Sequence, residues 1–580
     1  MESVLNALRE LSGKKEPGVH FANASGSLRH LTSDQLIMQA RRFAGGLRKL
    51  GVKEGEPVIL VMTEPESAIT AILGCMIAQC PPTPVYPPMN LRAVSGFLNF
   101  LKHVAARSLS TFIVADPQPY RILGNVPKNS PPIRGVAQFS DVLMNAQVAD
   151  FPQTVPDVAF LQFTSGSTSV PKGVMVQHSG LAANLEMIRK ASHMDRNSCV
   201  VTWLPVYHDM GLIGTVLNAI TLPCKLIVIP PVVFLKRPRL WLEFITHLRG
   251  THTAAPNFAF GLCVRRIPDR NGIDLASMTT FICGAEPVLP KTMEDFVNHF
   301  SAFGLSPGAL VPAYGLAEAT LAVTFTPHLR GLKTDRVDLE TLTAGRTAIR
   351  LDDNARTVRV ASCGLPMPGL SVRITSENGK LEPERKIGEI QVAGPSVTPG
   401  YIGDEVATRE SRTSDGWLKT GDLGYVADGE LYVCGRIKDV IIVSGKNYHA
   451  HDLESAAAEV AGVRIGNVVA FSSRNETGES LVVIAETRDE QRSHDLGKQI
   501  RNHLASTLGI SPDHVVVVPP ATLPKTSSGK LKRLETKALY EKGELGKRIG
   551  ALVNVTEVLK SKLGFLRRSI SSHERNSSTN

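Results

Sequence analysis

Short apolar runs alternate with helical patterns from residue 56 onward, and this alternation restricts the fold more than any other feature of the sequence. EPVILVM (Glu56–Met62) is typical of a buried strand, and SAITAILGCMIAQC (Ser67–Cys80) is typical of a helix built from small residues. STFIVA (Ser110–Ala115) predicts a further strand, and the same rhythm continues as far as TTFICGAE (Thr279–Glu286). Strands that alternate with helices form a largely parallel sheet covered by helices. The predicted fold class is therefore α/β.

Two changes of pattern divide the rest of the chain. From about Arg350, closely spaced short strands with turn signals predict a small antiparallel β subdomain. After Gly435–Arg436, a new series of strands and helices predicts a separate α+β domain. A chain of 580 residues is also too long for one compact core. We therefore expect a large domain over 1–436, a small domain over 437–547 and a basic, partly disordered tail over 548–580.

The net charge of +10 is spread along the chain and forms no long basic block. This pattern does not favour nucleic-acid binding, whereas an anionic small substrate or an acidic protein partner fits it. No apolar run approaches the roughly 18 residues that cross a bilayer, so stable membrane insertion is not expected. The eight cysteines form no CxxC pair, and the N-terminus is typical of a short amphipathic helix rather than a signal peptide. We therefore expect reduced thiols and a cytoplasmic protein.

A polar loop follows a short apolar strand at Ala159–Phe163. The stretch FTSGSTSVPKG (Phe163–Gly173) combines hydroxyl side chains, glycines and Lys172. Glycines allow backbone N–H groups to approach an anion, and hydroxyls add further donors. The spacing fits neither the P-loop pattern GxxxxGK[ST] nor the dinucleotide pattern GxGxxG. From these residues alone, a phosphate-binding loop and an ordinary strand–helix connection both remain open.

Five further stretches accompany this loop, and together they resemble the adenylate-forming superfamily of acyl-CoA synthetases, peptide-synthetase adenylation domains and luciferases. The resemblance extends over roughly residues 20 to 540. It implies a large N-terminal domain of two stacked, mostly parallel α/β subdomains plus a small β subdomain, followed by a small mobile α+β domain. In chain order the stretches are WLPVYHDMGL (Trp203–Leu212), CGAEP (Cys283–Pro287), YGLAEATLAV (Tyr314–Val323), TGDLGY (Thr420–Tyr425) with Gly435–Glu454, and PKTSSGKLKR (Pro524–Arg533).

The resemblance implies a reaction that joins a carboxylate to the α-phosphorus of ATP and releases pyrophosphate. Lys530 matches the lysine that contacts both the substrate carboxylate and the phosphate. Glu318 matches the carboxylate that helps to hold Mg²⁺ on the phosphates, and Thr168 is a second expected metal contact. His208 resembles a histidine between the acyl and phosphate sites. The His208–Asp209 pair does not indicate a hydrolase dyad, because adjacent residues in a strand point to opposite faces.

The other motif residues are expected around the nucleotide. Tyr314 would enclose the adenine together with the backbone of the GAE stretch. Asp422 would accept hydrogen bonds from both ribose hydroxyls, a role that suits an ionised carboxylate. Arg436 would contact the ribose or a phosphate. The full set of expected ATP and AMP contacts is Thr164, Ser165, Gly166, Ser167, Thr168, Lys172, Gly284, Ala285, Glu286, Tyr314, Gly315, Leu316, Ala317, Asp422 and Arg436.

The acid to be activated is expected to be a fatty acid. Amino-acid-activating relatives carry an aspartate for the α-amine just after the histidine motif, whereas the stretch that follows Asp209 here is apolar. Between Tyr314 and Ser362 the chain is also longer than in CoA-forming relatives. This expected insertion, about 327–359, resembles that of fatty acyl-AMP ligases, which pass the acyl group to a phosphopantetheinylated acyl carrier protein. It is strongly charged and would consist of short added strands.

Docked on the large domain, such an insertion would bias the rotation of the small domain about Lys438, the expected hinge. The chain departs from the subfamily at Ala450, near which a proline is usual. Two alternatives remain open from the sequence. One is a fatty acyl-CoA synthetase with a neutral loop insertion, and the other is a non-catalytic nucleotide- or lipid-binding regulatory module.

Overall fold

The computed structural model forms two compact units, Met1–Lys438 and Asp439–Asn580. The expected tail over 548–580 lies outside the described residues. The residues that the structure describes are 3–87, 94–123, 133–164, 171–344, 346–351, 357–443, 446–475, 478–489, 493–525 and 530–545.

A nine-stranded sheet forms the centre of the first unit, in the order β17-β14-β13-β12-β11-β9-β10-β1-β2. All pairs from β13 to β1 are parallel, whereas β2, β14 and β17 pair antiparallel at the two edges. Parallel strands need cover on both faces, and β9 and β11 are buried at every position. The bounds are β1 (Val19–Ala22), β2 (Leu28–Leu31), β9 (Cys199–Thr202), β10 (Lys225–Val228), β11 (His252–Ala255), β12 (Thr280–Cys283), β13 (Leu310–Gly315), β14 (Ala322–Phe325) and β17 (Leu365–Pro366).

A second, four-stranded sheet in the order β4-β3-β5-β6 is parallel throughout. Its strands β3 (Val58–Val61) and β5 (Phe112–Ala115) are buried at every position and confirm the two strands predicted from apolar runs. The helix predicted between them is α3 (Pro65–Ile77), in which all but one residue are buried. The remaining strands are β4 (Pro82–Pro84) and β6 (Gly135–Gln138), and a separate antiparallel hairpin joins β7 (Val158–Thr164) to β8 (Lys172–Gln177).

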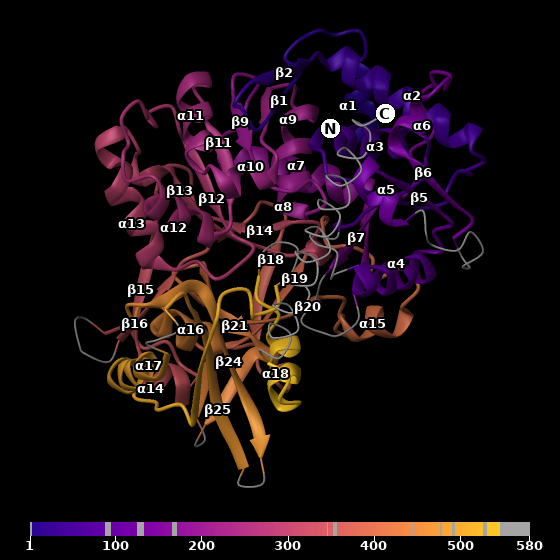
Figure 1. Ribbon diagram of the computed structural model, residues 1–580. Helices are drawn as coiled ribbons and strands as arrows, with labels where there is room; N and C mark the ends of the chain where they lie inside the picture. The colour runs from indigo at the N-terminus through magenta and orange to yellow at the C-terminus, as the bar shows by residue number, and fades with distance from the viewer. Residues whose placement is uncertain are drawn as a thin grey trace, which may run out of the picture. The chain divides into compact units, whose positions relative to one another are not determined.

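Helices accompany both sheets, which confirms the predicted α/β class. In Figure 1, α11, α12 and α13 lie beside β11, β12 and β13, and α2, α3 and α6 lie with β5 and β6. The predicted N-terminal amphipathic helix is α1, whose apolar side chains are buried. The bounds are α1 (Val4–Leu11), α2 (Ser33–Lys49), α4 (Val94–Ser108), α5 (Pro117–Leu123), α6 (Phe139–Leu143), α7 (His178–Ser192), α8 (Asp209–Gly211), α9 (Asn218–Thr221), α10 (Pro231–Lys236), α11 (Arg239–Leu248), α12 (Asn257–Arg266) and α13 (Pro290–Phe300).

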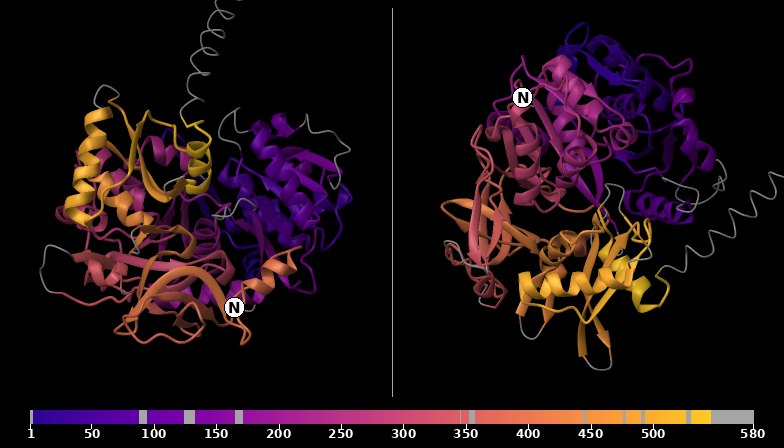
Figure 2. Two further views of the ribbon diagram at one scale, coloured as in Figure 1. Left: turned by 90° about the horizontal axis from the view of Figure 1, so that it is seen from below. Right: turned by 60° about the vertical axis from the view of Figure 1, so that its left-hand side comes forward.

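The predicted antiparallel subdomain is a four-stranded sheet in the order β18-β19-β20-β21. Beside β21 lies β16, which pairs antiparallel with β15. Figure 2 shows the orange strands of the four-stranded sheet from two further sides. The segment that joins these two strands contains a short helix, α14, which the sequence did not predict. The bounds are β15 (Thr334–Asp338), α14 (Leu339–Ala344), β16 (Thr357–Ala361), β18 (Ser371–Thr375), β19 (Gly388–Ala393), α15 (Glu405–Glu410), β20 (Leu418–Ala427) and β21 (Glu430–Arg436).

The second unit has the α+β pattern predicted for it. A three-stranded sheet pairs β25 antiparallel with β24 and parallel with β26. Helices α16 and α17 place Leu453, Ile500 and Leu504 in the apolar core formed with this sheet. The bounds are β22 (Val440–Val443), β23 (Lys446–His449), α16 (Ala450–Ala458), β24 (Val463–Asn475), β25 (Gly478–Thr487), α17 (Ser493–Leu508), β26 (His514–Val518) and α18 (Arg533–Glu541).

Candidate functional site

The β7–β8 hairpin carries the polar loop that opened the functional prediction. Thr164 ends β7, Lys172 begins β8, and the two residues pair directly across the hairpin. The expected contacts Ser165, Gly166, Ser167 and Thr168 lie outside the described residues. The structure therefore places the two ends of this loop.

Lys172 lies against an aromatic residue that the sequence did not single out. Its Nζ is 4.8 Å from the centroid of the Tyr401 ring. The hydroxyl of the same tyrosine donates a hydrogen bond to Glu318 Oε1 across 2.8 Å. Burial raises the pKa of Tyr401 well above its usual value and the charge of Glu318 adds to the rise, so this hydroxyl remains a donor. Lys172 and Glu318, two predicted site residues from distant parts of the chain, thus both contact the side chain of Tyr401.

Glu318 lies in a tight turn between β13 and β14. It belongs to a 3₁₀ turn, η5 (Ala317–Ala319), which ends at Thr320 with a φ of 70°. Leu316 N donates to Leu321 O across 2.8 Å. A Cβ at Gly315 would lie 1.9 Å from that same carbonyl oxygen, so the turn requires glycine there. The YGLAE stretch thereby holds the glutamate on a fixed backbone.

A second group of predicted residues gathers between β13 and the small antiparallel sheet. The Tyr314 hydroxyl donates to Asp422 Oδ2 across 2.7 Å. Arg436 pairs with Asp422 in the β20–β21 register, and its Nε lies 3.2 Å from Asp422 Oδ1. Burial raises the pKa of Tyr314 well above its usual value, and the charge of Asp422 raises it further. An ionised carboxylate has several acceptor sites, so Asp422 can bind a neutral donor and a cation at the same time.

The GAE stretch follows β12 and turns sharply. Ala285 has a φ of 66°, in the left-handed region. Glu286 Oε1 accepts a hydrogen bond of 2.6 Å from Phe258 N, in the first turn of α12. A carboxylate at a helix N-terminus satisfies a donor that would otherwise lack a helical partner. The side chain of Glu286 therefore ties this stretch to α12.

His208 does not lie in a strand, so the reasoning from alternating strand faces was wrong. It is the N-cap residue of α8, and its Nδ1 lies 3.3 Å from Asp209 Oδ1. The chain turns into a helix at this point, which brings the two neighbouring side chains together. Gln162 of β7 also donates to Tyr207 O across 3.0 Å, linking the phosphate-loop hairpin to the histidine. A π-helical segment, η2 (Leu212–Leu217), follows directly.

The apolar residues that follow the histidine motif are part of the core. Leu212, Ile213 and Val216 belong to one large apolar cluster of the first unit. In a second cluster, the rings of Trp203 and Phe234 stack at 3.9 Å between centroids. The apolar stretch that follows Asp209, which the sequence linked to a fatty acid, is therefore packed into the protein core.

The second unit contains Lys530, at the end of the PKTSSGK stretch. Residues 526–529 lie outside the described part of the chain, but the segments on either side are joined by a β-bridge between Lys525 and Leu531. Lys532 N donates to Pro524 O across 2.9 Å. These backbone contacts form a fixed base next to Lys530.

Arg533, which begins α18, ties this base to two other parts of the second unit. Its Nη1 lies 2.6 Å from Asp439 Oδ2, and its Nη2 lies 2.8 Å from Glu454 Oε1 in α16. Burial alone would lower the pKa of Arg533, but the charges of Glu454 and Asp439 hold it above its usual value. Asp439 directly follows Lys438, the expected hinge residue and the last residue of the first unit.

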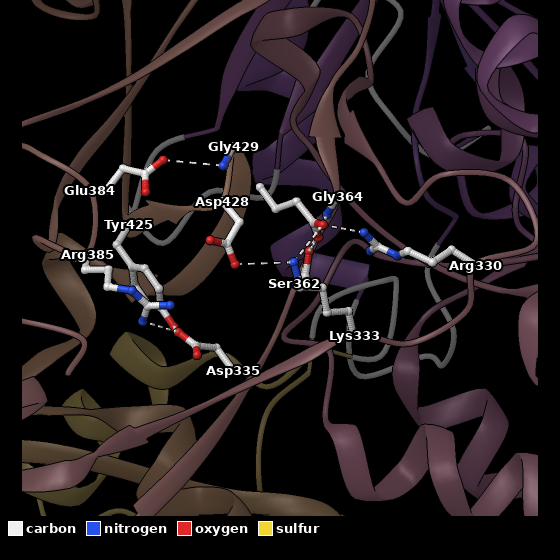
Figure 3. A network of polar contacts seen from close by, with 11 residues as sticks. Arg330, Lys333, Asp335, Ser362, Gly364, Glu384, Arg385, Tyr425, Asp428 and Gly429 are labelled. Carbon is white, nitrogen blue, oxygen red and sulfur yellow. Dashed lines mark hydrogen bonds and ion pairs between the residues drawn. The ribbon is translucent and has the colours of Figure 1, made fainter. Parts of the chain in front are cut away.

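The expected insertion is tied to the small antiparallel sheet of the first unit through two buried carboxylates, one of which, Asp335, is labelled in Figure 3. Asp335, in β15, accepts a hydrogen bond of 2.9 Å from Arg385 Nη1 and one of 3.0 Å from the Tyr425 hydroxyl. Glu430, in β21, accepts a hydrogen bond of 3.0 Å from Lys333 Nζ. These contacts join residues of the expected insertion to the sheet that also carries Asp422.

Further donors complete the surroundings of Glu430. Arg330 and Ser362 both donate to its carboxylate. Burial alone would raise the pKa of Glu430, but the hydrogen bonds from Ser362, Arg330 and Lys333 hold it below its usual value. Val337 of the same segment is fully buried. The charges of the expected insertion therefore act as anchors alongside its apolar side chains.

The described residues contain no cluster of three or more His, Cys, Asp or Glu side chains that could hold a metal ion. Mg²⁺ is usually held by one or two carboxylates and the substrate phosphates, with water completing its shell. Glu318, held by Tyr401 close to Lys172, fits that requirement. No helix in the described part of the chain is long and apolar enough to cross a membrane.

Comparison with known families gives two matches along the chain. The family described as AMP-binding enzyme matches residues 12–402, and the family described as Disco-interacting protein 2-like, AMP domain, matches residues 438–548. The first match alone spans more than half of the chain.

Individual proteins are similar over almost the whole length. A putative ligase of Mycobacterium tuberculosis, Rv1013, is 33% identical, with 88% of this chain and 95% of that protein covered. The medium-chain-fatty-acid–[acyl-carrier-protein] ligase JamA of Moorena producens is 32% identical, with 90% of this chain and 92% of that protein covered. A solved structure from a study of fatty acyl-adenylate ligases of E. coli and L. pneumophila has a TM-score of 0.88 and 30% identity, and covers 94% of this chain and 98% of that one.

These similarities agree with the motif order and with the convergence of Tyr314, Asp422 and Arg436. The predicted resemblance to the adenylate-forming superfamily and its fatty acyl-AMP ligases is confirmed, and the chain belongs to the family of AMP-binding enzymes.

Proposed function

We propose that this protein uses ATP and Mg²⁺ to convert a fatty acid into its acyl-adenylate, and then passes the acyl group to a phosphopantetheinylated acyl carrier protein. The observation that carries the proposal is the contact between Tyr314 and Asp422, which brings together two expected nucleotide-binding motifs from different sheets. The names of JamA and of the fatty acyl-adenylate ligase structure support a fatty acid as the substrate, and the name of JamA supports an acyl carrier protein as the acceptor.

In the nucleotide site, each group has a simple task. Tyr314 lies against the adenine, together with the backbone of Gly284, Ala285 and Glu286. Asp422 accepts hydrogen bonds from the ribose hydroxyls, a role that suits an ionised carboxylate with several acceptor sites. The guanidinium of Arg436 binds ribose or phosphate oxygens. Gly315, Leu316 and Ala317 complete the expected set of contacts.

Adenylation needs little proton chemistry. A fatty acid is already a carboxylate at neutral pH, and one of its oxygens attacks the α-phosphorus while pyrophosphate leaves. The work of the protein is therefore to align the two anions and to neutralise the charge that builds up on the phosphoryl oxygens. Lys172, at the end of the polar loop, is assigned to the β- and γ-phosphates, together with Thr164, Ser165, Gly166, Ser167 and Thr168.

Lys530 is assigned to the reacting centre. Its ammonium would contact the carboxylate and the α-phosphate together, and rotation about Lys438 would bring the second unit into place. His208 lies beside the acyl carboxylate. Bound Mg²⁺ would neutralise phosphate charge, with Glu318 as its protein ligand and Thr168 as a second expected contact.

In the second step, the phosphopantetheine thiolate attacks the acyl carbonyl carbon and AMP leaves with the electron pair of the broken acyl–phosphate bond. The net charge of +10 supports an acidic carrier protein as the acceptor. All eight cysteines, each in the described part of the chain, are buried thiols, which supports the expected cytoplasmic location.

The proposal is tested with purified protein, ATP, Mg²⁺ and a series of fatty acids, with pyrophosphate release as the readout. Acyl-adenylate identified by mass spectrometry is the expected product. A protein that binds ATP but releases no pyrophosphate with any acid would instead be a regulatory nucleotide-binding module. Ready formation of acyl-CoA would make it a fatty acyl-CoA synthetase.

A further inference from the structure

We propose that Tyr401 is a positioning residue for adenylation, which holds Glu318 and Lys172 in place for the phosphates of ATP and their Mg²⁺. The inference rests on the proposed function, because it takes those two charged groups as the ones that face the phosphates. It adds a residue to which the motifs assigned no role.

The side chain of Tyr401 uses two different surfaces for two opposite charges. Its hydroxyl donates to Glu318 Oε1 across 2.8 Å, and its ring face lies 4.8 Å from the Lys172 ammonium. The residue is only 8% exposed, so neither contact competes strongly with water. A cation over a buried aromatic face and a hydrogen bond to a carboxylate are both stabilising.

The same arrangement keeps the two charges from neutralising each other. Within the described residues, no ion pair joins Lys172 to Glu318, because the tyrosine binds each of them separately. A direct ion pair would occupy the ammonium and the carboxylate with each other and would have to break when Mg·ATP binds. With Tyr401 in place, Glu318 keeps its other oxygen for the metal and Lys172 keeps its donors for phosphate.

The backbone around Tyr401 is joined to both of its partners. Tyr401 bridges Val174 of β8, while Ile402 N donates to Gly173 O across 2.8 Å. On the other side, Thr398 N donates to Glu318 O across 2.9 Å. The segment 398–402 is therefore fixed to the strand that begins at Lys172 and to the turn that contains Glu318. Such double attachment is typical of a residue that orients a metal ligand rather than of a surface side chain.

The first variant is Tyr401→Phe, which removes the hydroxyl and keeps the ring under Lys172. Isothermal titration calorimetry measures the Kd of ATP with Mg²⁺ and, separately, with EDTA. We expect the Kd of Mg·ATP to rise about tenfold, the lower range for lost support of a metal ligand, while the Kd measured in EDTA changes little. The Mg²⁺ concentration that half-saturates pyrophosphate release should rise to a similar extent, and excess Mg²⁺ should restore kcat.

The matched control is Tyr425→Phe, which also removes a buried tyrosine hydroxyl that donates to a carboxylate, Asp335, across 3.0 Å. This variant is expected to bind Mg·ATP like the unchanged protein. Tyr401→Leu removes the ring as well, so ATP should bind more weakly even in EDTA. An unchanged Kd of Mg·ATP in a folded Tyr401→Phe protein would overturn the inference.

A double-mutant comparison gives a second criterion. If Tyr401 acts through Glu318, the double variant Tyr401→Phe, Glu318→Gln should bind Mg·ATP about as weakly as Glu318→Gln alone. Losses of affinity that add up in the double variant would contradict the inference. The inference and the proposed function fail differently. If the protein without substitutions makes no acyl-adenylate, the proposed function is wrong. If it makes acyl-adenylate but Tyr401→Phe does not change its Mg²⁺ dependence, only the inference about Tyr401 is wrong.

Discussion

Tyr314 donates a hydrogen bond of 2.7 Å to Asp422, and this contact joins the nine-stranded sheet to the small antiparallel sheet. Tyr314 lies in β13 and Asp422 in β20, so two motifs that are far apart in the sequence form one polar site. The carboxylate is also paired with Arg436. The orientation of the Asp422 carboxylate therefore depends on both partners.

Removing the hydroxyl should weaken nucleotide binding without removing the stacking surface. In Tyr314→Phe, Asp422 keeps Arg436 but loses the tyrosine hydroxyl, so we expect its orientation to relax and the Kd of ATP to rise roughly 5- to 10-fold, which corresponds to about 1 to 1.4 kcal/mol and is within the range of one hydrogen bond. Calorimetric titration with ATP measures the change. Equal affinity in the variant and the unchanged protein would contradict the assigned role.

The anchor of the expected insertion should contribute measurably to the stability of the first unit. Asp335→Asn leaves the Arg385 guanidinium without its buried carboxylate, and we expect the free energy of unfolding to fall by about 3 kcal/mol. Urea unfolding followed by fluorescence gives this value.

The control for that anchor is an exposed pair in the same region. Arg346 contacts Glu377 across 2.7 Å, but the two side chains are 41% and 79% exposed. Arg346→Ala should therefore change the free energy of unfolding by less than about 1 kcal/mol. Similar losses for the buried and the exposed pair would show that Asp335 is not an anchor.

Buried His178 should make the first unit sensitive to mild acid. Burial lowers the pKa of His178 from 6.5 to about 4, so the unfolded chain takes up a proton between these values that the folded protein does not. The contribution of His178 to the free energy of unfolding should be constant above pH 6.5 and fall by about 3 kcal/mol as the pH drops toward 4. His178→Gln should flatten this part of the pH profile, and an unchanged slope would contradict the prediction.

Arg533 should stabilise the second unit and the position of Lys530. Arg533→Ala leaves Asp439 and Glu454 without their shared cation, so thermal unfolding should begin at a lower temperature and pyrophosphate release should slow. Lysine cannot reproduce the planar fork that reaches both carboxylates, so Arg533→Lys should rescue only in part. Lys537→Ala, which removes an exposed pair with Glu541, serves as the control. Full rescue by lysine would contradict a bidentate role.

Sequence patterns predicted the regular elements well because those elements depend on local burial. The runs at Glu56–Met62 and Ser110–Ala115 became β3 and β5, since strands buried on both faces need continuous apolar residues. The motif order likewise indicated Tyr314, Asp422 and Arg436, which the fold brings together.

The contacts that cross the fold could not be predicted in this way. Tyr401 contacts Glu318 because the segment that contains it pairs with the edge of β8. The hydrophobic periodicity of a sequence does not indicate a pairing of this kind. The prediction of a strand around His208 was wrong, because His208 is the N-cap of α8 but its side chain makes no capping hydrogen bond that the sequence could signal. Asp335 and Glu430 are buried charges whose partners lie far away in the sequence.

One competition experiment tests the central claim most directly. The protein is incubated with ATP, Mg²⁺, a fatty acid and equal concentrations of CoA and a phosphopantetheinylated carrier protein, with Lys530→Ala as the inactive control, and the products are identified by mass spectrometry. We expect acyl-adenylate and acylated carrier protein, no acyl-CoA, and no pyrophosphate from the Lys530→Ala protein. Acyl-CoA as the main product would contradict the proposed acceptor, and the absence of acyl-adenylate would contradict the proposed reaction.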